Sequence, residues 1–85
     1  MTRKCVEIIR RNTLYPRHAA AFARAAGRFV CEVTAISGEY RVDGKSILGL
    51  ISLEPQIGMT IIIEADGEDE QVAVDILAKI LEGYY

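Results

Sequence analysis

The chain has 85 residues, 51% of them hydrophobic and 26% charged, and its formal net charge is −2 at pH 7. This composition excludes a disordered chain, and the length predicts a single domain, residues 1–85, that folds without disulfide staples. No apolar run approaches the roughly 20 residues of a membrane helix, so we expect a cytoplasmic protein with no secretion signal and no membrane insertion.

The first predicted strand covers residues 4–10, and residues 11–14 form a turn. Pro16 suits the first position of a helix, where the N–H group that proline lacks would have no partner. Tyr15 then takes the capping position, for which its long side chain is poorly suited. An alanine-rich helix follows, and Gly27 is expected to end it as the residue after the last helical turn.

Basic and acidic residues are unevenly distributed along the chain. Most of the basic residues lie in residues 1–28, whereas most of the acids follow. An acidic C-terminal part argues against binding to nucleic acid. Arg17, Arg24 and Arg28 have the spacing of one helix face, which either docks an acidic partner or an anionic group or is a solvated surface.

A second strand is predicted at residues 31–36 and a third at 40–43, joined as a hairpin by the turn at 37–39. Cys5 and Cys31 both lie in strand patterns, and neither belongs to a CxxC spacing. We therefore expect two buried thiols and no metal or redox site.

A short helix is predicted at residues 47–52, with Ser46 as its N-cap and Pro55 preventing its continuation. The β-branched segment 60–65 is typical of a central strand, which would leave no long apolar edge and favours a monomer.

The last element is a helix whose first turn contains the acidic residues 68–70, and their charge suits a helix N-terminus. Its apolar stripe contains Val74, Leu77, Ala78 and Leu81, widened by Ile76 and Ile80. The order of elements is strand, helix, strand, strand, helix, strand, helix. Short connections favour a mostly antiparallel sheet with helices on one face, an α+β fold.

This order, the length and two segments resemble the HPr family, the phosphocarrier proteins of the bacterial phosphoenolpyruvate:sugar phosphotransferase system. The resemblance implies an open-faced sandwich with strand order 1423 and three helices on one face. Residues 44–53, GKSILGLISL, resemble the family's regulatory-serine region. In relatives that have an HPr kinase/phosphorylase, the serine at the position of Ser46 is phosphorylated with ATP.

The second segment is similar to the family's phosphoryl-accepting sequence, Leu-His-x-Arg-Pro-Ala-Ala. The corresponding residues here are Leu14, Tyr15, Pro16, Arg17, His18, Ala19 and Ala20. The resemblance implies that Arg17 flanks the phosphoryl group, that Tyr15 occupies the position of the carrier histidine, and that His18 occupies that of the proline. It does not assign the carrier role to His18.

His18 is the only histidine of the chain. In the first turn of a helix the dipole favours a neutral, nucleophilic imidazole, and Arg17 offers a forked donor for phosphate oxygens. However, residue 18 lies about 300° around the helix from residue 15. His18 is therefore either a displaced phosphoryl acceptor or a half-exposed histidine with a local hydrogen bond. The phenol of Tyr15 is a poor nucleophile and is better suited to anchoring a partner.

Ser46 is compatible with two roles, since a hydroxyl that caps a helix is also favourably placed for phosphorylation. The resemblance implies that the surface beside it docks proteins. Its residues would be Ile47, Leu48 and Ile51 of the short helix and Arg17, Ala20 and Arg24 of the first helix.

Three functions follow. The first is a regulatory, protein-binding HPr-like protein controlled at Ser46 and lacking the carrier histidine, as in the catabolite-repression HPr-like proteins. The second is an active phosphocarrier that accepts a phosphoryl group from enzyme I on His18. The third is an HPr-fold binding module without phosphotransfer. The partners implied are enzyme I and an HPr kinase/phosphorylase or a regulator. We expect no cofactor, and no enzyme with independent turnover.

Overall fold

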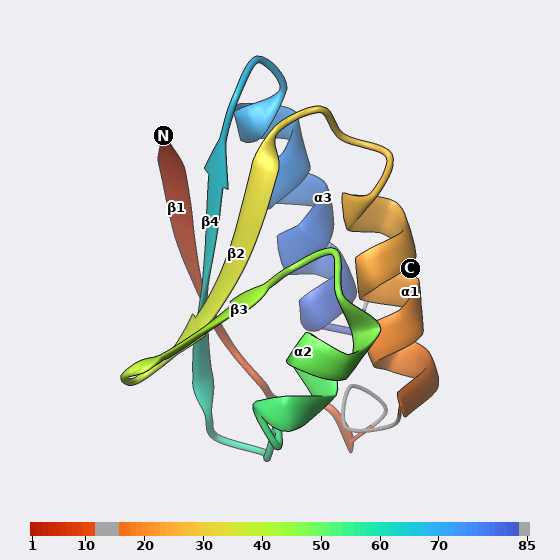
Figure 1. The fold of residues 1–85 in the computed structure, drawn as a ribbon. Helices are drawn as coiled ribbons and strands as arrows, with labels where there is room; N and C mark the ends of the chain where they lie inside the picture. Colours follow the sequence, from red (N-terminus) through yellow and green to blue (C-terminus); the bar gives the residue numbers. More distant parts are fainter. Residues whose placement is uncertain (12–15, 84–85) are drawn as a thin grey trace.

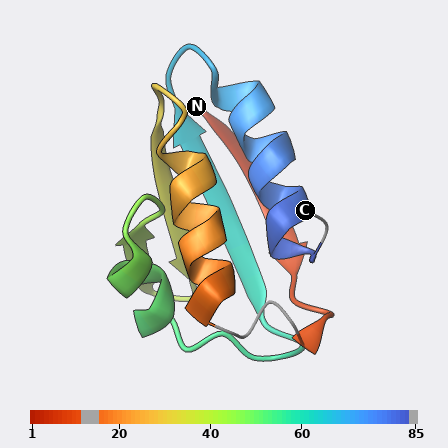
Figure 2. The same ribbon diagram turned by 90° about the vertical axis from the view of Figure 1, so that its right-hand side faces the viewer.

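The computed structural model describes residues 1–11 and 16–83. Its elements in chain order are β1 (Thr2–Glu7), α1 (Pro16–Ala26), β2 (Glu32–Ser37), β3 (Tyr40–Asp43), α2 (Ile47–Ser52), β4 (Thr60–Asp66) and α3 (Glu70–Leu81). The strands form one antiparallel sheet in the order β1-β4-β2-β3. The three helices lie on the same face of this sheet (Figures 1 and 2). The open-faced sandwich with order 1423 is therefore confirmed.

Strand β4 occupies the interior of the sheet, paired with β1 on one side and β2 on the other. Its β-branched residues fit a pleated surface with neighbours on both edges. Ile61, Ile63 and Ala65 are buried beneath the helices, whereas Ile62 and Glu64 point to the opposite face. The prediction of a central strand here is confirmed.

The core fills the space between the sheet and the helices. Phe22 and Ala26 of α1 and Val74 and Leu77 of α3 are almost fully buried against β4 and β2. Burial of each of the larger side chains, Phe22, Val74 and Leu77, stabilises the fold by about 1.5–3 kcal/mol. Leu50 packs against this cluster and against a second, smaller one, so that α2 is joined to the same core.

The carboxylate of Asp69 connects the start of α3 to the loop between α1 and β2. It accepts hydrogen bonds from the backbone N–H groups of Val30, at 2.8 Å, and Cys31, at 3.0 Å. The hydrogen bond from Val30 and that from Cys31 outweigh partial burial, and they lower the pKa of Asp69. Asp69 is thus the residue before α3 but makes no side-chain hydrogen bond to its own helix.

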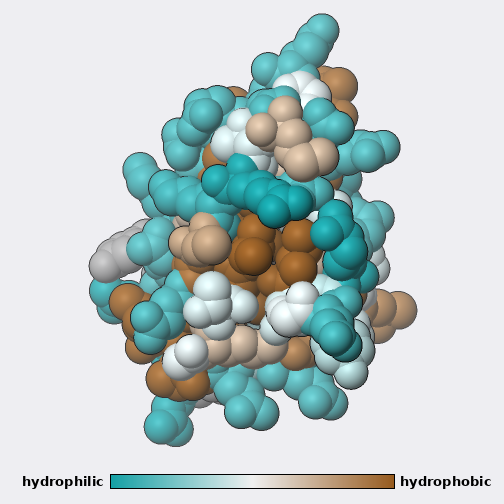
Figure 3. Space-filling model, turned by 90° about the vertical axis from the view of Figure 1, so that its left-hand side faces the viewer, coloured by the Kyte–Doolittle hydropathy of each residue, from teal (hydrophilic) through white to brown (hydrophobic). Residues whose placement is uncertain are grey.

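The helix-free face of the sheet has an apolar centre bordered by hydrophilic side chains (Figure 3). On this face Glu64 is only 6% exposed. Its carboxylate lies 2.7 Å from Nε of Arg3 and accepts a hydrogen bond of 2.9 Å from Arg41. Burial opposes ionisation, but the hydrogen bond from Arg41 and the charges of both arginines outweigh it, so the pKa of Glu64 is lowered.

The predicted bounds of the first two strands were wrong. Strand β2 covers Glu32–Ser37 and not residues 31–36. Strand β1 begins at Thr2 and ends at Glu7, not at residues 4–10. Backbone pairing continues one residue further, since Ile8 exchanges hydrogen bonds with Met59 and Gly58. The next residue, Ile9, is 55% exposed, so its apolar character does not mark a strand.

Two expectations about side chains were also wrong. Cys31 is buried as predicted, but Cys5 is exposed, because alternate residues of β1 face the helix-free side of the sheet. Arg28 lies beyond the end of α1 at Ala26 and therefore does not continue the helix face of Arg17 and Arg24. The helix ends before Gly27 as predicted, but Gly27 does not adopt a positive φ.

In the part of the chain that the structure describes, the helices are all too short or too polar to cross a membrane.

Candidate functional site

Helix α1 places His18 on its inner face. The imidazole is 2% exposed, although it belongs to the first turn of the helix. His18, Phe22 and Ala26 follow one another at intervals of four, and all three are buried. The prediction of a half-exposed histidine is therefore wrong, because this side of the first turn faces the core.

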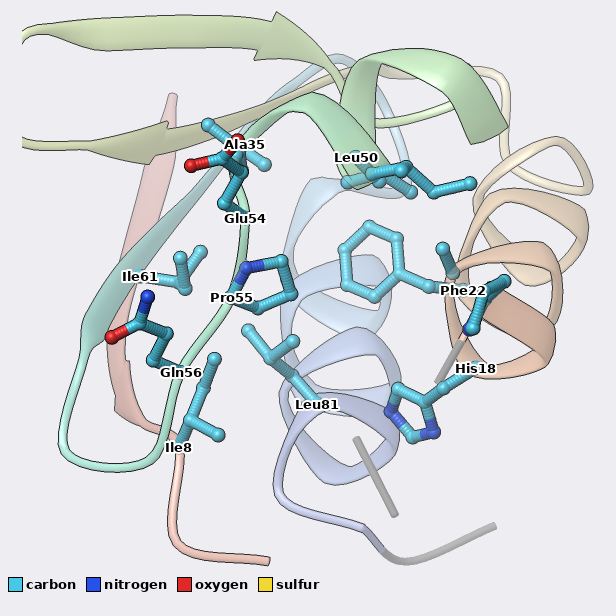
Figure 4. Close-up of a pocket in the computed structure, with 14 residues that line it drawn as sticks. Ile8, His18, Phe22, Ala35, Leu50, Glu54, Pro55, Gln56, Ile61 and Leu81 are labelled. Carbon is cyan, nitrogen blue, oxygen red and sulfur yellow. The ribbon is translucent and has the colours of Figure 1, made fainter. Parts of the chain in front are cut away.

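The environment of His18 favours the neutral imidazole. Burial lowers the pKa of His18, and a hydrogen bond with the backbone of Ile80 in α3 opposes this only in part. A neutral imidazole is nucleophilic. In this structure, however, the ring is covered by protein and points towards Leu81 (Figure 4).

The other predicted residues of α1 lie on its outer side. Arg17 and Arg24 are exposed, and Ala20 is half-buried. Arg17 therefore carries a guanidinium at the surface within one residue of the buried imidazole. Tyr15, the predicted partner anchor, lies outside the described residues.

Ser46 caps α2, as predicted from the sequence. Its backbone is extended, with φ −105° and ψ 117°, and its Oγ accepts a hydrogen bond of 3.1 Å from the N–H group of Gly49. The ammonium group of the preceding residue, Lys45, donates to the carbonyl of Phe29 at 2.9 Å. Lys45 is thus engaged with the loop after α1 and not with Ser46.

The α2 patch comprises Ile47, Leu48 and Ile51, which are 43%, 81% and 39% exposed. Leu50 and Leu53 of the same segment turn inwards and pack against the core. Since a six-residue helix cannot bury every apolar side chain, three of them remain at the surface beside α1. The prediction that these residues are exposed is confirmed, and their role in binding stays a prediction.

A cavity of about 330 Å³ lies beneath α2 and beside the first turn of α1. Figure 4 shows Phe22, Leu50, Pro55 and Leu81 around its centre, with His18 at one side. The sequence gives little indication of this cavity, because the described residues that line it come from seven different elements or connections. The spacing of His18 and Phe22 on one face of α1 is the only feature of the sequence that indicates part of the cavity wall.

The described residues contain no group of three or more histidine, cysteine or acidic side chains arranged to hold a metal ion. Burial, together with the nearby carboxylate of Asp69, raises the pKa of the Cys31 thiol to about 11. The buried cysteine is therefore protonated at neutral pH and a poor nucleophile.

Comparison with known proteins gives a consistent result. The family described as PTS HPr component phosphorylation site matches residues 2–83. The phosphocarrier protein HPr of Haemophilus influenzae is 42% identical over 81 residues, which cover 95% of both chains. The solved structure of HPr from Bacillus anthracis superposes with a TM-score of 0.87 at 33% identity, covering 93% of this chain and 94% of the other.

A second kind of relative is also similar. The crystal structure of Crh from Bacillus subtilis, described as a catabolite repression protein and an intertwined swapped dimer, superposes with a TM-score of 0.79 at 38% identity. It covers 85% of this chain and 83% of that protein. With a family match over nearly all of its length and relatives above 30% identity, this chain belongs to the HPr family of phosphotransferase-system phosphocarrier proteins.

Proposed function

We propose that this chain is a regulatory, protein-binding member of the HPr family, controlled by phosphorylation of Ser46 and without a working carrier histidine. The observation that carries the proposal is the burial of the only histidine, since His18 is 2% exposed. Enzyme I would have to deliver a phosphoryl group to a ring nitrogen inside the protein. A misplacement of about 1 Å already reduces rates by about 10²-fold, so delivery to a covered atom is strongly disfavoured.

Phosphorylation of Ser46 requires only a surface helix and its cap. In the reaction with ATP, Oγ of Ser46 forms a bond to the γ-phosphorus, the bond to ADP breaks, and the hydroxyl proton passes to the kinase. The N–H group of Gly49 already points at Oγ, and it would face the new phosphate. Exposed side chains follow immediately in the α2 patch, so a kinase can reach this side of the helix.

The partners are proteins that dock on the α2 patch and the adjoining side of α1. Exposed apolar side chains bordered by Arg17 and Arg24 suit a partner with an apolar contact area and acidic neighbours. Ala20 lies between the two arginines in sequence and is half-buried, and its small side chain leaves room for a partner to approach the helix closely. Enzyme I, an HPr kinase/phosphorylase or a regulator are the partners that the family implies.

We further propose that the protein acts in the cytoplasm as a monomer. The related Crh is described as a swapped dimer. Light scattering at several protein concentrations distinguishes the two, because a monomer keeps the mass of a 9.4 kDa chain.

The decisive experiment incubates the protein with ATP and an HPr kinase and measures its intact mass. We expect a gain of one acid-stable phosphoryl group, which Ser46→Ala abolishes. Ser52→Ala is the matched control, because Ser52 belongs to the same helix and its exposed hydroxyl donates to the carbonyl of Gly49. Failure of the wild-type protein to accept phosphate, or acceptance by Ser46→Ala, contradicts the proposal.

A second incubation, with phosphoenolpyruvate and enzyme I, tests the carrier alternative. We expect no acid-labile phosphate on the protein. An acid-labile phosphoryl group that disappears in a folded His18→Gln variant would instead assign the carrier role to His18. Circular dichroism of that variant separates loss of the acceptor from loss of the fold.

A further inference from the structure

The cavity beneath α2 has no part in the proposed phosphorylation of Ser46, and Ile51 is the one residue that it shares with the α2 patch. Its volume of about 330 Å³ lies at the lower end of the range for small-molecule sites. Ile51 and Pro16 line it and are also exposed, so the cavity is open to solvent between α1 and α2. A molecule from solution can therefore enter it without unfolding of the sheet.

The interior of the cavity is apolar. Phe22 and Ile61 are buried side chains of its wall, and Leu50, Leu53 and Leu81 complete a surface of rings and branched chains. An apolar cavity of roughly 150 Å³ holds a benzene molecule. A space about twice as large suits a bicyclic aromatic ring with a short side arm.

The polar groups lie on two opposite sides of this interior (Figure 4). Glu54 and Gln56 come from the connection between α2 and β4, and His18 comes from α1. Among the described residues that line the cavity, Glu54 is the only acid, and there is no lysine or arginine. Burial lowers the pKa of His18, which favours the neutral imidazole, so the charge of the described lining residues is the negative charge of Glu54.

Glu54 is also held in an unusual backbone conformation. Its φ is +51°, which is uncommon for a residue with a side chain, and its N–H group donates to the carbonyl of Ile51 at 3.0 Å. The end of α2 thus fixes the carboxylate-bearing residue at the edge of the cavity. A glycine would adopt this conformation without cost but would bring no charge.

From these observations we propose that the cavity binds a small arylalkylamine. The aromatic ring occupies the apolar interior, and the protonated amine at the end of its short arm pairs with the Glu54 carboxylate at the rim. The exposed carboxylate contributes selectivity more than affinity, since a solvated ion pair is weak. The proposal does not depend on phosphorylation of Ser46.

Tryptamine is a suitable probe, because the chain contains no tryptophan and indole fluorescence then reports the ligand alone. We expect a blue shift of the tryptamine emission that saturates with a Kd of roughly 0.1–1 mM, as for other ligands of about a dozen non-hydrogen atoms. Indole-3-propionate has the same ring and the opposite charge. It should bind at least about threefold more weakly.

Three variants test the location. Ala19→Leu places two branches into the mouth of the cavity and should weaken tryptamine binding about tenfold or more. Ala21→Leu is the matched control on the same helix, outside the lining, and should leave Kd unchanged. Glu54→Gln should remove the preference for tryptamine over indole-3-propionate without affecting the fold, because its side chain is exposed.

Each result supports or overturns the proposal. No saturable shift below about 10 mM, equal binding of the two indoles to the wild type, or equal effects of the two leucine substitutions would overturn it. If the preference for the amine persists in Glu54→Gln, the assignment of the carboxylate is wrong.

Discussion

Removal of the Ser46 hydroxyl tests the local structure of α2 independently of any kinase. In Ser46→Ala the N–H group of Gly49 loses the oxygen that lies 3.1 Å from it. Loss of a side-chain N-cap costs about 1 kcal/mol of the free energy of unfolding. For a domain of this size, that corresponds to a melting temperature about 4–8 °C lower. Thermal and urea unfolding followed by far-UV circular dichroism measure both quantities.

Two further variants make this test specific. Ser46→Asp keeps an oxygen that can accept from Gly49 and should unfold within about 0.5 kcal/mol of the wild type. Ser52→Ala removes an exposed hydroxyl from the other end of α2, and its free energy of unfolding should also lie within about 0.5 kcal/mol of the wild type. If Ser46→Ala matched the wild type, or if Ser46→Asp lost as much stability as Ser46→Ala, the capping bond would not be the source of the effect.

The same magnitude decides whether Ser46→Ala is a fair control for phosphorylation. Domains of this length have unfolding free energies of about 5 kcal/mol or more. A loss of about 1 kcal/mol leaves the folded state dominant, so a missing phosphate in Ser46→Ala reports the missing hydroxyl and not an unfolded substrate.

Three other predictions concern His18, Gly67 and Glu54. Burial lowers the pKa of His18 from 6.5, so the unfolded chain binds a proton at a higher pH than the folded protein does, and the free energy of unfolding should fall as the pH drops from about 7 towards 5. Urea unfolding measures this dependence on pH, and the contribution of His18 should be absent from His18→Leu. Gly67 has φ 151°, and a Cβ there would lie 2.6 Å from the Cα of Cys31, so Gly67→Ala should lower the free energy of unfolding by about 2–4 kcal/mol. Gly38→Ala is the comparison, because its Cβ would meet nothing within 4 Å, and it should cost about 1 kcal/mol. Thermal melts compare the two. Glu54→Gly should raise the unfolding free energy by about 0.5–1 kcal/mol in urea titrations, since it relieves a positive φ; a loss would show that the Glu54 side chain is stabilising.

Local chemistry was sufficient to place the elements of the central part of the chain. The predicted strand 40–43 and helix 47–52 coincide with β3 and α2, because a hairpin turn and a serine cap mark their ends. Composition and periodicity supported an antiparallel sheet covered on one face. The strand order itself came from the family resemblance, because pairing between distant strands leaves no local signal.

Prediction failed where the outcome depends on which side of an element meets the core. The alternation around Cys5 was recognised, but not which of its two faces lies beneath the helices. The cavity could not be predicted, since its walls come together only after α1, α2 and the end of α3 have packed on the sheet.

His18 shows how two physical effects compete at one residue. The start of a helix suggests exposure and a nucleophilic imidazole, and this local argument treats the first turn as solvent-facing. The interval of four residues from His18 to Phe22 and again to Ala26 indicates the opposite, since the largest apolar side chain of α1 must face the sheet. Burial decided the outcome, and it also constrains any role of His18 in phosphotransfer. Because His18 is 2% exposed, a phosphoryl group on this imidazole would require the groups that cover the ring to move, so labelling of His18 would report a conformational change as well as chemistry.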